Sequence, residues 1–540
     1  METIIELVQL IERHKARDIE VIGYGKGKEI SKLNAFYSRM VKKEICDDRG
    51  AAALFFGSDP SDLSYRKFKS KFKRRVLNTI FFLNIKQPEF TESNRAYLNC
   101  LKEIYAAKIL LNRGVVRAAI DLAHKALKRC TYFEFTELSL DLCRMLRTLY
   151  STRYPDSRKF SHYHKLTQSL AAQYELETLA QGYYLFLASN FMGTRASSPK
   201  VAEQAKEFVR DLDNHPHNIP SFYYRRYYLQ IVTLTAMCGN EYRNALQISK
   251  SALEWIDTRP FNAPSVKTFF QFQIIACCTY LREYDEGLKY AQTNLEQERQ
   301  GSMNWFKNRE LYFTLAMHTG NYQEAYLTYL QVVQNQDFKK LDAYHIEQWK
   351  IFEAYIVYLK RISKVETALH DSGNGFRLYK FLNEVPLFTR DKLGLNIPIL
   401  VIQILFSIAS GSYVMASNRI VEIEKYCSKY LRKNENYRSD LFIRMLLEIP
   451  QANFHESSVN RRIQRWKQKL QEMPLEKANK GRHIEVIPYE SLWEMTVASL
   501  NSSAYHPSKT AKRIQKFAYA VSEPLPPASK KNKKGKGSGK

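Results

Sequence analysis

The chain has 540 residues, which is too long for one compact core and allows two to four domains or one elongated repeat array. Apolar residues make up 45%, whereas glycine (20) and proline (17) are scarce. Because both are poor helix formers, this composition favours a mainly helical protein. The net charge of +27 favours polyanionic partners such as nucleic acid, acidic proteins or anionic membrane surfaces, although solubility with diffuse attraction also explains it.

Residues 1–90 are predicted to hold two or three helices and one extended piece. The first fourteen residues, METIIELVQLIERH, are typical of an amphipathic helix with acidic side chains, and they lack the basic start and long apolar core of a signal peptide. The stretch DIEVIGYGKGKEIS at 18–31 is a glycine-rich basic loop. It does not match a phosphate-binding loop, since Glu29 follows Lys28, so we predict a turn between helices.

A basic helix is predicted within residues 58–83. Ser58 or Asp59 would cap it, with Pro60 in its first turn. Phe68, Phe72, Val76 and Ile80 recur every four residues and predict a buried stripe. The remaining surface is basic and could lie along phosphates or be a solvated helix face. These basic candidates are Arg66, Lys67, Lys69, Lys71, Lys73, Arg74 and Arg75.

A spacing of glycine, aromatic and alanine recurs in the middle of the chain. The copies are Gly320-Asn321-Tyr322-x-x-Ala325 and Gly411-Ser412-Tyr413-x-x-Ala416, with looser forms at Gly239/Tyr242/Ala245, Tyr284-x-x-Gly287 and Gly114-Val115-Val116-x-x-Ala119. The anchors at 116, 242, 284, 322 and 413 are 126, 42, 38 and 91 residues apart. These gaps fit multiples of roughly 38–45 residues, the length of a helix-pair repeat. Glycine would end one helix, Asn or Ser would cap the next, and the small residue would let two helices approach.

These residues resemble the tetratricopeptide repeat family, in which Gly-Asp/Asn-Tyr-x-x-Ala opens the second helix of each pair. YRNALQISKSAL at 242–253 and GVVRAAIDLAHKAL at 114–127 also keep the small residue seven positions later. The Trp-x-x-Leu-Gly start of the family's first helix is absent, and the spacing is longer and irregular. The resemblance implies a right-handed superhelical array of antiparallel helix pairs that binds peptides or protein surfaces. A generic α-helical bundle is the alternative.

SFYYRRYYLQ at 221–230 interleaves tyrosines with Arg225 and Arg226. Such a cluster can stack on single-stranded bases. The helical spacing of Tyr224, Tyr228 and Ile231, however, favours packing inside a repeat helix.

The C-terminal third is predicted to be helical. The uncharged run between Pro398 and Gly411 is too short to span a membrane, so we predict a buried helix. Two amphipathic segments at 488–500 and 510–521 could cap the array, and residues 522–540 should be disordered. Six lysines crowd the last eleven residues, and removing them still leaves a charge of +21. The tail's polyanion-binding candidates are Lys530, Lys531, Lys533, Lys534 and Lys536.

No catalytic or metal motif stands out. The eight cysteines form no Cys-x-x-Cys pair, which favours reduced, buried thiols in a cytoplasmic protein, and no His-Glu-x-x-His occurs. We therefore predict no metal, cofactor or catalytic residue and no enzymatic activity, although a catalytic domain within 1–90 is a further hypothesis. The predicted segments are 1–90, a helical part with the basic helix; 91–435, the repeats; 436–521, a helical cap; and 522–540, the tail. The predicted function is a scaffold that binds an acidic protein or peptide. The alternative is a nucleic-acid or ribonucleoprotein binder.

Overall fold

The structure is a computed structural model that describes residues 32–80 apart from 43 and 46, then 91–194, 199–215, 219–366, 396–430, 437–477 and 485–500. These residues form 20 α-helices and two short 3-10 helices, with no strand among them. The all-α prediction is therefore confirmed for this part of the chain. Its residues fall into two compact units, 1–174 with 259–262, and 175–258 with 263–540. The segment boundaries given above remain predictions.

The first unit contains a small three-helix cluster. It consists of α2 (Lys32–Val41), α3 (Asp48–Phe56) and α4 (Leu63–Ile80). Phe36 lies at its centre, with ring centroids 5.1 Å from Phe55 and 4.8 Å from Phe72. Phe68 and Val76 pack against the same cluster, so the stripe predicted on the basic helix is confirmed for its first three members.

Longer helices follow in the chain, namely α5 (Glu92–Asn112), α6 (Val116–Tyr132), α7 (Thr136–Thr152) and α8 (Ser157–Thr194). The interface of α5 with α6 is built from small residues. Cys100, Ala107, Ala119 and Ala126 are all 0% exposed. Small side chains let the two helix axes approach closely, which is the role predicted for Ala119 and Ala126.

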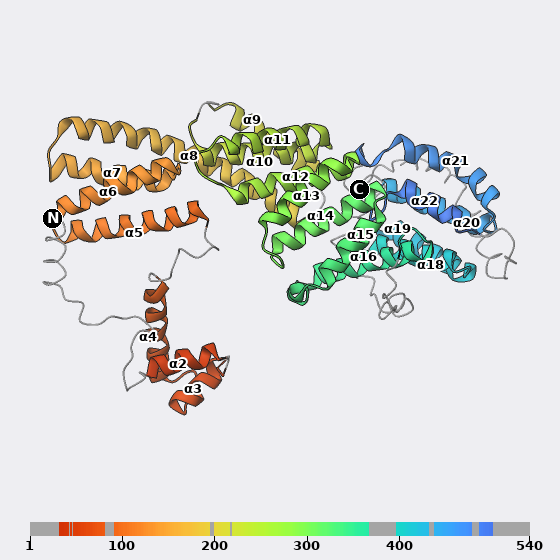
Figure 1. Cartoon of the computed structure of the whole chain (residues 1–540), viewed down its shortest axis with the longest axis horizontal. Coiled ribbons are helices and arrows are strands. Elements are labelled where there is room, and N and C mark those ends of the chain that lie inside the picture. The colour runs from red at the N-terminus through yellow and green to blue at the C-terminus, as the bar shows by residue number, and fades with distance from the viewer. Residues whose placement is uncertain are drawn as a thin grey trace, which may run out of the picture. The chain divides into compact units, whose positions relative to one another are not determined.

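In the second unit, neighbouring helices also pack in adjacent pairs (Figure 1). Its first members are α9 (Pro199–Asp213), α10 (Phe222–Cys238), α11 (Tyr242–Asp257), α12 (Pro264–Leu281), α13 (Tyr284–Gln297), α14 (Met303–Thr319), α15 (Tyr322–Val333) and α16 (Ala343–Arg361). Beyond these sequence neighbours, α12 also packs against α10 and α14.

Side-chain contacts show which helix ends meet. Phe222 at the start of α10 stacks on Trp255 near the end of α11 at 5.4 Å. The ammonium of Lys267, near the start of α12, forms an ion pair with Asp257 at the end of α11. Glu298, just after α13, accepts hydrogen bonds from Thr268 of α12 (3.3 Å) and Asn304 of α14 (3.1 Å). The first turns of α10, α12 and α14 therefore lie along one edge of this part of the unit.

The five predicted anchors all begin helices. Positions 116, 242, 284, 322 and 413 are the first residues of α6, α11, α13, α15 and α19. Gly114, Gly320 and Gly411 have φ values of 81°, 82° and 67°, a left-handed conformation that glycine adopts without strain. In the looser copy at Gly239/Tyr242/Ala245, Asn240 instead of the glycine adopts the left-handed conformation, with φ 61°. The predicted cap at Asn321 is wrong, because its side chain donates to the Thr319 hydroxyl instead of capping α15.

The other anchor residues are packed as the pattern predicts. Tyr242 is 2% exposed and stacks on Tyr280 with ring centroids 4.2 Å apart. Tyr413 stacks on Phe454 at 4.3 Å. At Gly287, an added Cβ would lie 2.5 Å from Leu315 Cδ2 and 3.1 Å from Cys278 Cβ, so a larger residue would require the Leu315 side chain to move. The packing supports helix pairs without identifying the family.

The last helices share a large apolar core. They are α18 (Asn396–Ala409), α19 (Tyr413–Tyr430), α20 (Tyr437–Gln451), α21 (Glu456–Glu472) and α22 (Tyr489–Ala498). Residues 397–408 of α18 are buried, which confirms the predicted buried helix. Within the described residues no helix is long and apolar enough to cross a membrane. Helix α22 belongs to the same core, with Leu492 1% and Trp493 2% exposed. The segment predicted at 510–521 lies outside the described residues.

Candidate interaction surfaces

Helix α4 turns its basic side chains away from its apolar stripe. Because Phe68, Phe72 and Val76 face the core, the residues between them point outward. Arg66, Lys67, Lys69, Lys71, Lys73 and Arg74 are exposed, and Arg75 is half-buried. Helix α4 begins at Leu63, three residues after Pro60, which the sequence had placed in the first turn. The start is set by Asp62, whose carboxylate accepts the backbone N–H of Tyr65 at 2.8 Å. The surface predicted from the sequence therefore exists, and its binding role stays a prediction.

One lysine of this surface already has a partner. Lys69 donates to the Asp48 carboxylate at 2.6 Å, and the Tyr65 hydroxyl donates to the same carboxylate at 2.6 Å. The hydrogen bond from Lys69, followed by that from Tyr65, lowers the pKa of Asp48. Burial and the neighbouring Asp48 raise the pKa of Tyr65 to about 12. Lys69 therefore links α4 to α3 while remaining on the exposed surface.

The tyrosine–arginine cluster of α10 is packed internally. Tyr224 and Tyr227 are buried, which confirms the packing interpretation of this segment. The Arg226 guanidinium lies 4.3 Å from the Tyr227 ring centroid and donates to its hydroxyl at 2.5 Å. Tyr228 donates to Asp213 at 2.8 Å. Base stacking on these rings would require the cluster to open, whereas Arg225 and Arg226 remain half-exposed on the helix.

Charge divides between alternate helices of the second unit. Helices α10, α12 and α14 contain five basic residues and one acid. These are Arg225, Arg226, Lys267, Lys307, Arg309 and Glu310. Helices α11, α13 and α15 contain three basic residues and six acids. The formal charges are +4 and −3, although Lys267 pairs with Asp257 of α11 and Lys307 pairs with Glu310. We call the side-by-side helices α10, α12 and α14 the basic layer.

A second aromatic–basic surface lies on α21 and was missed by the sequence analysis. Three cations surround the half-buried ring of Trp466: Arg444 and Arg465 at 5.2 Å and Lys469 at 5.4 Å from its centroid. Arg461 is exposed one turn before Arg465. Basic residues recur here every four residues, at Arg461, Arg465 and Lys469, with Trp466 between the last two. This spacing could have predicted the surface from the sequence.

Arg438 is the centre of a buried ionic network. Only 3% of its side chain is exposed, and it donates to Glu485 at 2.8 Å and to Glu490 at 2.7 Å. It also donates to the Met473 carbonyl at 2.7 Å. Burial opposes the charge of Arg438, but the two carboxylates outweigh it and raise its pKa. Burial also raises the pKa of Glu485, whereas Arg438 outweighs burial at Glu490 and lowers its pKa. The network joins α20, the end of α21 and the start of α22.

His318 borders this network. Its Nε2–H donates to the Glu485 backbone carbonyl at 2.6 Å, since a carbonyl can only accept. Burial, helped by the charges of Arg282 and Arg438 and opposed by the hydrogen bond to the Glu485 carbonyl, lowers the pKa of His318 to about 4. The imidazole is therefore neutral at physiological pH. Every contact in this network is internal, so it stabilises the fold and offers no open site.

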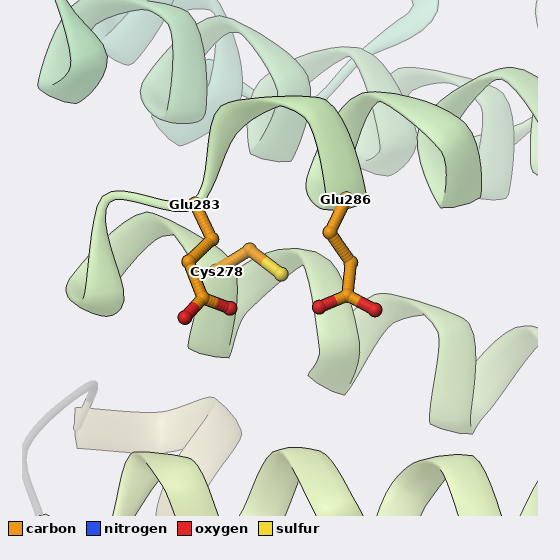
Figure 2. A group of neighbouring side chains, drawn as sticks. All are labelled: Cys278, Glu283 and Glu286. Atoms are coloured by element: carbon orange, nitrogen blue, oxygen red, sulfur yellow. The ribbon is translucent and has the colours of Figure 1, made fainter.

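Cys278, Glu283 and Glu286 gather beside the start of α13, with ligand atoms within 4.8 Å of one another (Figure 2). Both carboxylates already have cationic partners. Arg243 lies 2.8 Å from Glu283, and Lys250 forms an ion pair with Glu286. Burial, followed by the two glutamates, raises the pKa of the Cys278 thiol to about 12, so it stays protonated. Because Arg243 and Lys250 already hold the two carboxylates, we assign no metal to this group.

The described cysteines Cys100, Cys130, Cys143, Cys238, Cys277 and Cys278 are buried and form no disulfide. The lysine tail and the glycine-rich loop lie outside the described residues. No family model, curated protein or solved structure matches the chain.

Proposed function

We propose that the chain is a non-enzymatic scaffold that binds an acidic segment of a protein partner. In this proposal its helices form antiparallel pairs of a right-handed superhelical array similar to tetratricopeptide repeats. Support comes from the anchors that begin α11, α13, α15 and α19 and from the helix ends that meet in the second unit. Such arrays present a long face formed by one helix of each pair.

The separation of charge carries the proposal. The α10–α12–α14 layer has a formal charge of +4, while the alternate helices carry −3. A potential of one sign over a continuous layer selects partners of the opposite sign and steers their approach. Apolar residues on the same helices, such as Phe269 and Phe272 of α12, pack against the core but keep part of their surface exposed. A peptide with acidic and aromatic residues therefore fits this layer best.

The test uses the full chain and a fluorescein-labelled 20-residue peptide of glutamate, aspartate and phenylalanine. Binding is followed by fluorescence anisotropy. We expect Arg225→Glu and Lys307→Glu each to weaken binding about tenfold, corresponding to ~1.4 kcal/mol. Arg226 is left intact because it packs on Tyr227.

Lys289→Glu provides the matched control. Lys289 is exposed on α13, so this variant changes the net charge equally but lies on the acidic set of helices. We expect less than about a twofold effect. Equal weakening by all three variants would show that net charge alone attracts the peptide, and this would contradict the proposed layer.

Nucleic-acid binding is a second candidate, and the surroundings of Trp466 favour it. An indole ring among Arg444, Arg465 and Lys469 could stack on an unpaired base while the cations contact phosphates. The α4 surface would add further phosphate contacts. Arg444 is also paired with Asp440, which leaves Arg465 and Lys469 as the stronger phosphate ligands.

This candidate is tested with a 20-nucleotide poly(U) RNA. Binding should weaken steeply between 50 and 300 mM salt, with Trp466→Ala costing about five- to hundredfold in affinity. The charge variant Arg465→Glu should make the RNA affinity less dependent on salt concentration, whereas Lys289→Glu should leave this dependence unchanged. Binding that disappears at 150 mM salt and is indifferent to Trp466 would reduce this function to diffuse attraction.

A further inference from the structure

Two exposed leucines lie on the outward side of α4, opposite the stripe that faces the core. Leu63 and Leu77 are 63% and 50% exposed. They are about four turns apart, so they fall within about 40° of each other around the helix axis and about 21 Å apart along it. An outward arc of about 80° contains both leucines and holds Leu63, Lys67, Ser70, Arg74 and Leu77. The leucines therefore stand at the two ends of one polar, basic face.

The carboxylates near this face have other roles. Helix α4 itself contains seven basic residues and no acid. Asp47 and Asp62 accept backbone N–H groups in the first turns of α3 and α4, and Asp48 holds the lysine on the flank of α4. Among the described residues, no carboxylate pairs with Arg66 or Lys67. The outward face is therefore open to an anionic partner.

The aromatic rings of the three-helix cluster indicate which polyanion fits. Phe68 packs against Phe36 with ring centroids 5.3 Å apart, and Tyr65 is 2% exposed. The outward arc itself contains no ring, whereas single-stranded nucleic acid is bound largely by stacking on aromatic side chains. Leucines instead find an apolar partner in the acyl chains of a bilayer, whose anionic lipids attract Lys and Arg to its surface. An anionic membrane surface therefore matches the cations and the leucines together.

We propose that the outward face of α4 binds the surface of a membrane that contains anionic lipids, with Leu63 and Leu77 inserted between the headgroups. The cations around the leucines contact the lipid phosphates and carboxylates. The three-helix cluster keeps its fold in this mode, because its core uses the opposite stripe of α4. This inference is independent of the proposed scaffold, whose binding layer lies on α10, α12 and α14.

Co-sedimentation of the full chain with lipid vesicles tests this surface. The vesicles contain phosphatidylcholine alone or with about 30% phosphatidylserine, in about 150 mM salt. We expect binding only to the vesicles with phosphatidylserine, and a partition coefficient at least about tenfold lower for Arg66→Glu/Lys67→Glu. Both residues are exposed near the start of α4, where glutamate is compatible with the helix dipole, so the variant keeps its fold. Equal binding to both kinds of vesicle would overturn the proposal.

The variant Leu63→Ser/Leu77→Ser separates insertion from attraction by charge alone. We expect about tenfold weaker partitioning, because serine has no apolar surface to bury among the acyl chains. Leu185→Ser/Leu327→Ser is the matched control, since these leucines are 56% and 42% exposed on α8 and α15. It should leave partitioning within about twofold of the wild type. Unchanged binding of Leu63→Ser/Leu77→Ser would show that no leucine inserts, and the proposal would be wrong.

A charge control comes from the basic layer. Arg225→Glu/Lys307→Glu changes the net charge by the same amount as the α4 variant, and it should weaken binding of the acidic peptide while leaving vesicle binding within about twofold. Arg66→Glu/Lys67→Glu should do the reverse, so failure of this proposal and failure of the proposed scaffold are distinguishable. Equal loss of vesicle binding in both variants would overturn the membrane surface in favour of net charge. Poly(U) RNA binding that needed Arg66 and Lys67, without any vesicle binding, would assign the face to nucleic acid instead.

Discussion

Arginine and lysine have opposite surroundings in two regions of this molecule. Around α20 and α22, the Arg438 side chain is 3% exposed and both of its carboxylate partners are at least half-buried. On α4, by contrast, the basic side chains point to solvent, and Lys69 is paired with an Asp48 side chain that is itself 52% exposed. The same residue types therefore fix a fold in one region and form a surface in the other. Net charge alone could not distinguish the two uses.

The difference predicts which charges the fold can lose. Removing a buried partner leaves the remaining charge without compensation, at a cost of several kcal/mol, whereas exposed pairs are screened by water and salt. Three measurements probe this division.

The largest expected effect is at Arg438. In the variant Arg438→Ala, Glu485 and Glu490 would lose their counter-charge inside the protein, and the loss should destabilise α20 and α22 by about 3–5 kcal/mol. Native-state hydrogen exchange of these two helices measures the effect, because it reports local stability without assuming that the whole chain unfolds in one step.

Arg444→Ala is the matched control on the same helix. Arg444 pairs with Asp440 at 2.8 Å, but its side chain is 41% exposed. We expect a loss below about 1 kcal/mol. If both variants lowered protection of α20 equally, the distinction between buried and exposed charges would fail for this region.

An intermediate effect is expected from His318 on acidification. Its pKa is about 4 in the folded protein, whereas the ordinary value is 6.5. The unfolded chain therefore binds the proton more readily, and His318 contributes full stability above pH 6.5. This contribution is lost as the pH falls from 6.5 to 4, by roughly 3 kcal/mol in total.

Urea unfolding of the wild type and of His318→Gln, each at pH 7.5 and 5.0, isolates the contribution of His318 to the free energy of unfolding. Glu485 has a raised pKa, so its stabilising contribution decreases as pH rises, which is the opposite slope. Arg282 and Glu490 also interact with His318, but they are present in both proteins. The wild type should lose more stability than the variant on acidification. Equal losses would exclude His318 as the source.

The sequence predicted the local features well because their causes are local. A left-handed residue ends a helix, and a tyrosine, or a valine at position 116, begins the next one two positions later, so the five anchors could be placed from short spacings. The stripe of Phe68, Phe72 and Val76 follows in the same way from a four-residue period. The buried helix at 396–409 needed only its length and its lack of charge.

Long-range pairings could not be read in this way. Arg438 meets Glu485 and Glu490 across 47 and 52 residues, and no spacing links them. Asp48 and Lys69 are 21 residues apart, so the partner of Lys69 was equally hidden. The charge of the α10–α12–α14 layer appears only when the helices that lie side by side are known. The α21 surface was different, since its four-residue period was visible in the sequence and was overlooked.

The smallest effect is predicted for Lys69→Ala on α4. Lys69 and Asp48 are 53% and 52% exposed, so water already screens their attraction. The three helices are held by the rings around Phe36 and by the Tyr65–Asp48 hydrogen bond, both of which the variant keeps. We expect the thermal midpoint to change by less than about 2 °C, and the change to shrink further in 0.5 M NaCl. A larger shift that persisted in salt would show that Lys69 is a structural residue, and the α4 surface would then lose one of its candidate ligands.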